Sequence, residues 1–156
     1  MLLRRADRAL YRAMLAGGGS VCFFEPEMEA HFERRAAIER ELREALELNT
    51  GKIVPHYQPL ISLADGRVTG FEVLARWTSE ALGSIFPDIF IPIAEETRLI
   101  GPLGDALLRR ACLDARSWPK DYSLAFNVSA VQLREPGFCP SLVVDFGRDR
   151  IRSTPP

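Results

Sequence analysis

The stretch VPHYQPLISLADGRVTGFEVLARW, residues 54–77, decides the fold of this chain of 156 residues. The segments 52–63 and 68–77 are both strand-like, and the Asp65-Gly66 pair between them is a typical hairpin turn. We therefore expect two neighbouring strands that pair antiparallel and begin the sheet of the domain.

Polar side chains recur on one face of these strands. Side chains alternate along a strand, so Glu72 and Arg76 share a face with Leu74. The opposite face carries apolar residues, which are Phe71, Val73, Ala75 and Trp77. On the first strand Gln58 shares a face with His56. Spacing alone leaves two interpretations open, namely a solvated or internally paired polar face and a binding site.

Further elements follow on both sides. Apolar spacing predicts helices at residues 2–15, 27–49, 87–97 and 103–118, and strands at residues 21–24 and 122–129. The order strand, hairpin, strand, helix, helix, strand is an α/β pattern. The strand expected at residues 122–129 carries Asn127 on the same face as Ala125 and Ser129. If the three polar faces converge, Gln58, Glu72, Arg76 and Asn127 meet there.

That combination of residues suits a phosphate and a hard metal ion. Carboxylate and amide oxygens are the ligands that Mg²⁺ or Mn²⁺ prefers. The planar guanidinium of an arginine matches a phosphate group. Glu95 and Glu96, by contrast, lie at the end of a predicted helix, and we interpret them as surface charges.

The overall composition points to an ordinary soluble protein. The chain is 47% hydrophobic and 26% charged, with a net charge of −1, so nothing indicates nucleic acid as a partner. Its three cysteines lack metal-binding spacing and suit a reducing cytoplasm. No apolar run reaches the roughly 18 residues of a membrane span. We therefore expect a cytoplasmic protein without a membrane segment.

Three segments resemble the EAL domain family. Residues 54–77 are similar to its opening strands, with the signature Glu-Ala-Leu present as Glu72-Val73-Leu74. FIPIAEETRLIGPLGDALLRRAC, residues 90–112, is similar to the family's FIPLAEE segment and the following helix. LAFNVSAVQL, residues 124–133, is similar to its NxSxxQ strand.

The resemblance implies a fold, an activity and a set of roles. EAL domains are similar in shape to a TIM barrel whose first strand is antiparallel to the rest. They hydrolyse cyclic-di-GMP to linear pGpG with two divalent ions, Mg²⁺ or Mn²⁺. Glu72 and Asn127 resemble the family's metal ligands. Gln58, Leu74 and Arg76 resemble its nucleotide-contacting residues.

A second resemblance covers the first residues. ADRALYRAMLAGGGSVCFFEPEM, residues 6–28, looks like the last helix and strand of a GGDEF diguanylate cyclase domain. We therefore expect a GGDEF remnant at residues 1–26, a helical linker at 27–51 and an EAL domain at 52–156. The linker helix could also pair with another copy of itself.

The EAL part is expected to be incomplete. A barrel of eight strands and helices usually needs about 250 residues, and the later carboxylates and lysine of the family have no counterpart in this sequence. The first hypothesis is therefore a truncated family member without catalysis of its own. The second is a module that binds cyclic-di-GMP without cleaving it, or that pairs with itself or with another EAL protein. The third is an active phosphodiesterase.

Overall fold

The computed structural model describes residues 2–15, 17, 19 and 21–134. The chain divides into two compact units, residues 1–41 and 42–156, which are described separately below. None of the helices in the described ranges is long and apolar enough to cross a membrane.

The first unit consists of helix α1, Leu2–Leu15, and most of helix α2, Pro26–Glu47. The helices predicted at residues 2–15 and 27–49 are confirmed. Helix α2 begins at a proline, whose missing N–H costs nothing in a first turn, and it carries Glu27 and Glu29 near its positive end. Ala9, Ala13, Met28 and Ile38 are buried in this unit.

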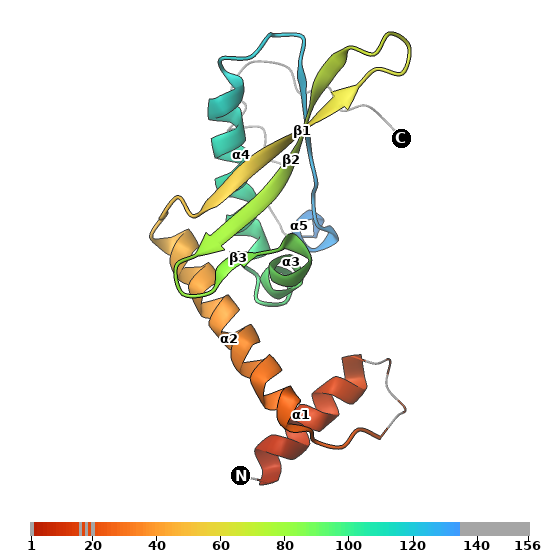
Figure 1. Ribbon diagram of the computed structural model, residues 1–156, viewed down its shortest axis with the longest axis vertical. Helices are drawn as coiled ribbons and strands as arrows, with labels where there is room; N and C mark the ends of the chain where they lie inside the picture. Colours follow the sequence, from red (N-terminus) through yellow and green to blue (C-terminus); the bar gives the residue numbers. More distant parts are fainter. Residues whose placement is uncertain (1, 16, 18, 20, 135–156) are drawn as a thin grey trace. The chain divides into compact units, whose positions relative to one another are not determined.

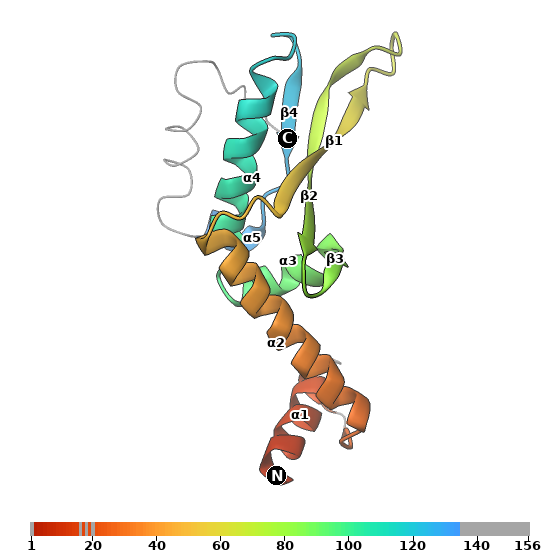
Figure 2. The same ribbon diagram turned by 60° about the vertical axis from the view of Figure 1, so that its left-hand side comes forward.

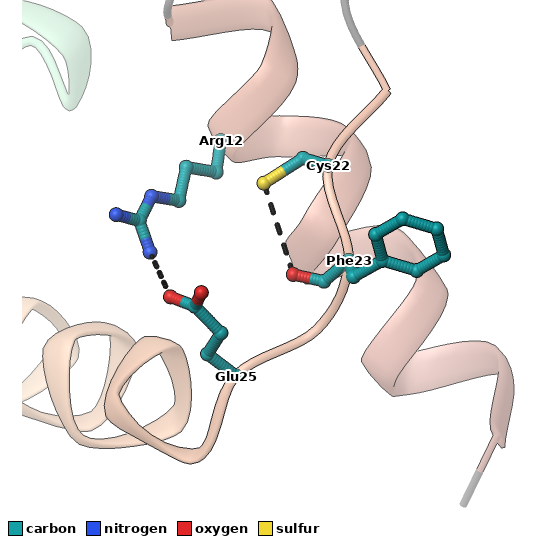
Figure 3. A network of polar contacts seen from close by, with 4 residues as sticks. All are labelled: Arg12, Cys22, Phe23 and Glu25. Atoms are coloured by element: carbon teal, nitrogen blue, oxygen red, sulfur yellow. Dashed lines mark hydrogen bonds and ion pairs between the residues drawn. The ribbon is translucent and has the colours of Figure 1, made fainter.

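The segment that joins the two helices is held by a polar contact. The guanidinium of Arg12 donates from Nη1 to Oε2 of Glu25 at 3.0 Å, and Cys22 Sγ lies 3.8 Å from the carbonyl oxygen of Phe23 (Figure 3). The prediction of a strand at residues 21–24 is wrong, because residues 21–25 have no regular secondary structure. A strand needs a neighbour to take up its backbone hydrogen bonds, and no strand within the described part of this unit offers one.

The second unit contains a four-stranded mixed sheet. Strand β1, Ile53–Ile61, pairs antiparallel with β2, Val68–Ser79, as predicted. Strand β3, Gly83–Ile85, pairs with the end of β2, and β4, Ser123–Phe126, runs parallel to β2. Figures 1 and 2 show β2 as the strand that all three others join.

Three helices complete this unit. Helix α3, Pro87–Glu96, and helix α4, Ile100–Ala115, connect β2 to β4, and α5, Ala130–Leu133, follows β4. A helical crossover is what a parallel strand pair requires. Helix α4 lies alongside the sheet in both ribbon views (Figures 1 and 2). The helices predicted at 87–97 and 103–118 are confirmed, whereas β3 and α5 were not predicted.

The core forms on the face of β2 that was predicted to be apolar. Val73 and Trp77 are buried on it, and the Trp77 ring meets Phe90 of α3 edge-on with the ring centroids 5.5 Å apart. The buried residues of α4 include Leu103, Leu107 and Ala111. The opposite face of the strand carries Glu72, Leu74 and Arg76, which are half-buried.

An aromatic cluster closes the other end of the sheet. Tyr57, Phe71, Trp118 and Tyr122 meet in edge-on and tilted ring contacts, and the Phe71 and Trp118 ring centroids are 4.7 Å apart. The Tyr57 hydroxyl donates to Oδ2 of Asp114 in α4 at 2.7 Å. Burial and this hydrogen bond raise the pKa of Tyr57 well above its ordinary value of 10.0.

The raised pKa of Tyr57 predicts a loss of stability in alkali. Below pH 10 the tyrosine is protonated in both the folded and unfolded states. Above pH 10 the unfolded chain releases this proton while the folded chain keeps it, so the free energy of unfolding falls. We expect Tyr57→Phe to lower stability by about 1 kcal/mol at pH 7 and to make the decline above pH 10 shallower. Urea titrations at pH 7 to 11 measure both effects, and parallel declines would contradict the assignment.

A glycine permits the close approach of β4 to β2. Gly70 faces Ser123, and a Cβ atom on Gly70 would overlap the carbonyl oxygen and Oγ of that serine. We predict that Gly70→Ala lowers the free energy of unfolding by about 1–3 kcal/mol, because the strand would have to move. Thr78→Ala, at an exposed position of the same strand, is the control. Equal urea midpoints for the two variants would contradict the prediction.

Candidate functional site

The candidate site lies on the polar face of β2, at the end where β4 stops. Glu72 faces Gln58 of β1 on one side and Ala125 of β4 on the other. Asn127 follows β4 directly, and its Nδ2 donates to Oε1 of Glu72 at 2.6 Å. The structure thus brings Gln58, Glu72 and Asn127 to one place, as the alternation of side chains predicted.

The register of the sheet explains this meeting. In the parallel pair the last matched residues are Val73 and Phe126, so the chain leaves the ladder immediately before Asn127. Asn127 therefore lies just past the end of β4, beside Glu72 in the middle of β2. The amide donates to the carboxylate, which satisfies part of the hydrogen-bonding capacity of a half-buried negative charge.

Arg76 lies near Gln58, Glu72 and Asn127 but makes its described hydrogen bond elsewhere. It shares the strand face with Glu72 four residues earlier, and its cross-strand neighbour is Val54. Its Nη1 donates to the carbonyl oxygen of Ala75 at 2.8 Å. A guanidinium has five N–H donors in a planar fork, so this contact leaves others for an anion.

A cavity of about 240 Å³ adjoins the site. Leu74, Arg76 and Asn127 line it together with apolar residues of α3 and α4, among them Ile91, Leu103 and Leu107. Leu74 therefore reaches the same space as Arg76 and Asn127. His56 is exposed on β1 opposite Leu74, on the same face of the strand as Gln58.

The residues present suit part of a metal site. Glu72 and Asn127 supply oxygen ligands of the type that Mg²⁺ and Mn²⁺ favour. No cluster of three or more histidine, cysteine, aspartate or glutamate side chains that could hold a metal occurs in the described ranges. Mg²⁺ is commonly held by one or two carboxylates together with water and substrate phosphate, so a single ion fits this donor set and a closed protein cage does not.

Two further residues of the site region were misjudged or missed. Glu95 was predicted to be a surface charge, but it is only partly exposed and accepts a hydrogen bond from Ser129 Oγ at 2.5 Å. Gln132 is buried, with an exposed fraction of 2%. The contact of Glu95 was not visible in the sequence, because its partner Ser129 is more than thirty residues away. Ser129 and Gln132, by contrast, stand at the spacing of a capping box, a local signal that the sequence does carry.

Comparison with known proteins identifies the family. The EAL domain model matches residues 39–153. The chain belongs to the EAL domain family. It is 46% identical over 142 residues to an uncharacterized signaling protein of Caulobacter vibrioides, covering 91% of this chain and 17% of the relative. It is 37% identical over 145 residues to the bifunctional diguanylate cyclase/cyclic di-GMP phosphodiesterase MucR of Pseudomonas aeruginosa, covering 90% of this chain and 21% of MucR.

Solved structures support the same assignment. The PaMucR phosphodiesterase, determined as a c-di-GMP complex, superposes with a TM-score of 0.61 and 33% identity, over 72% of this chain and 46% of that one. The expected likeness to EAL folds, including a first strand antiparallel to its neighbour, is therefore confirmed. This chain spans about a fifth of the length of the curated relatives named above.

The contact between Glu72 and Asn127 makes a prediction about charge. Asn127→Asp places a second carboxylate against Glu72, and two neighbouring carboxylates raise the pKa of one of them. The folded protein then binds a proton that the unfolded chain releases above about pH 4. We expect the variant to lose stability relative to the wild type as the pH rises from 4.5 to 8.

Asn127→Ala is the matched control, because it removes the hydrogen bond without adding a charge. Its difference in unfolding free energy from the wild type should be the same at both ends of this pH range. If Asn127→Asp behaved like Asn127→Ala across the range in urea titrations, residue 127 would not lie against Glu72.

Proposed function

We propose that the EAL part of this chain binds cyclic-di-GMP at the polar face of β2 together with Mg²⁺ or Mn²⁺. Glu72 and Asn127 are the metal ligands in this proposal. Gln58, Leu74 and Arg76 contact the nucleotide. The observation that carries the proposal is the contact of Asn127 with Glu72, directly opposite Gln58.

The chemistry of each residue fits its proposed role. Arg76 has guanidinium donors beyond the one that meets Ala75, and a phosphate oxygen accepts two of them in parallel. Leu74 offers an apolar surface beside it in the same cavity. Gln58 is exposed on β1 and can hydrogen-bond a nucleobase or ribose edge through its amide. The likeness to PaMucR, solved with c-di-GMP bound, supports this choice of ligand.

We propose binding, rather than hydrolysis, as the activity of this chain by itself. A divalent ion held by Glu72 and Asn127 would supply polarisation of a phosphoryl oxygen and activation of water, and hydrolysis in two-metal sites uses a second ion as well. Two ions need several carboxylates, whereas the described residues gather Glu72 and Asn127 at this point. Cleavage would therefore use groups beyond those two.

We also propose the domain division 1–26, 27–51 and 52–156, with the first segment similar to the end of a GGDEF domain. The alignment with MucR supports it, because 90% coverage of this chain is more than residues 39–153 alone could supply. Part of the sequence before residue 39 therefore also matches a protein named as a diguanylate cyclase and phosphodiesterase. Helix α1 is consistent with this proposal, whereas the strand expected after it is absent at residues 21–24.

Titration calorimetry with cyclic-di-GMP and Mn²⁺ tests the binding proposal. We expect saturable binding by the wild type, and a loss of at least tenfold in affinity for Arg76→Ala, since a charge-assisted hydrogen bond contributes about 1.5–3 kcal/mol. Arg67→Ala is the matched control, because Arg67 is exposed at the hairpin and its removal changes the net charge equally.

Two results would contradict the proposal. Wild-type protein that is folded but shows no saturable heat with cyclic-di-GMP would exclude binding by this face. Equal weakening by Arg76→Ala and Arg67→Ala would show that binding depends on net charge rather than on a phosphate contact beside Glu72.

A further inference from the structure

A polar cluster lies directly behind the candidate site, where the chain passes from β4 into α5. Its members are Glu95 at the end of α3, Ser129 before α5 and Gln132 within α5. Ser129 Oγ donates to Glu95 Oε1 at 2.5 Å and accepts from the backbone N–H of Val131 at 3.1 Å. The backbone N–H of Ser129 donates to Oε1 of Gln132, also at 3.1 Å.

These three hydrogen bonds hold both the hydroxyl group and the backbone N–H of Ser129. The exchange between Ser129 and Gln132 is a capping box, in which each side chain satisfies a backbone N–H of the other's turn. The bond to Glu95 is charge-assisted, which makes it stronger than a bond between neutral groups. It joins α5 to a helix that precedes it by more than thirty residues.

Gln132 anchors the cluster to the core. Its side chain is 2% exposed and lies against Gly104 of α4, where a Cβ atom would overlap Nε2. That Nε2 has no hydrogen-bond partner among the described residues. An unpaired buried amide is costly, so Gln132 is poorly explained as a packing residue alone and well explained by the bond that it accepts from Ser129.

Asn127 needs such support, because the sheet does not supply it. The β2–β4 ladder ends with Val73 and Phe126, so Asn127 lies beyond the last paired residue. Its side chain is exposed, and it donates a hydrogen bond to Glu72 from a position just past the end of β4. Ser129, two positions later, is held by the capping box of α5 and by Glu95.

We propose that Glu95, Ser129 and Gln132 are positioning residues that hold Asn127 in contact with Glu72. The inference deepens the proposed function, since Asn127 is a metal ligand only under that proposal. In this proposal they act through the place of Asn127 and not through a contact of their own with the ligand. They set the direction in which the chain leaves β4, and this direction sets the place of the Asn127 amide.

The direct test observes the Asn127 side-chain amide by ¹H–¹⁵N NMR in the whole chain without ligand. In Ser129→Ala we expect its two amide-proton signals to move toward the values of a free asparagine and to exchange faster with water. Ser129→Thr, which keeps the hydroxyl, should restore the wild-type signals. Glu95→Ala should act like Ser129→Ala, whereas Glu96→Gln, at the exposed neighbouring position, should leave the signals unchanged.

The backbone signals of β1 and β2 serve as the internal check on folding. If they stay in place while the Asn127 amide of both Ser129→Ala and Glu95→Ala keeps its wild-type shifts, the positioning role is overturned. Should Ser129→Ala fail to fold, Glu95→Ala decides alone, since it leaves the capping box of α5 intact.

Metal titration separates this inference from the function on which it rests. Loss of a group that orients a metal ligand typically weakens metal binding by about 10–100-fold. We expect Ser129→Ala to weaken Mn²⁺-dependent binding of cyclic-di-GMP at least tenfold, and Ser129→Thr to restore it. A wild type that binds no nucleotide would sink the proposed function, while the NMR result would still decide whether the cluster positions Asn127.

Discussion

The parallel register of β2 and β4 is the constraint on which the rest of the second unit depends. It matches Glu72 with Ala125 and Val73 with Phe126, so Asn127 is the first residue past the ladder. A slip of one residue would turn every side chain of β4 to the opposite face. Gly70 makes this register possible, because no side chain could fit between its Cα and Ser123.

The two faces of β2 carry different kinds of residue, one buried in the core and one at the candidate site. Val73 and Trp77 are buried against the helices, while Glu72 faces the polar side between Gln58 and Ala125. This division was readable from the sequence, because period-two alternation is a property of the strand itself. The paired strands at the start of the unit and the four longer helices were readable for a similar reason, since hairpin residues and apolar spacing are local signals.

What the sequence did not reveal depends on contacts between distant segments. Residues 21–24 have the composition of a strand, but a strand exists only where a neighbour accepts its hydrogen bonds. Strand β3 has only three residues and forms because the end of β2 is there to pair with it. Likewise, Glu95 was predicted to be a surface charge at a helix end, because the sequence does not show that Ser129 lies within hydrogen-bonding distance of it. The positions of Glu72 and Asn127 were predicted, whereas the turning of Arg76 toward Ala75 was not, because it is a choice of rotamer.

The pairing of an amide with a carboxylate avoids the repulsion that two carboxylates would have in this site. Two carboxylates at this separation would repel one another whenever the metal is absent. An asparagine can offer an oxygen to a cation or an N–H to a carboxylate, so under the proposed function the side chain that donates to Glu72 here would also be able to bind the metal. Such a contact is useful only if the asparagine is kept at the right place. Since the sheet ends one residue too early to hold it, that task falls to the cluster of Glu95, Ser129 and Gln132 behind it.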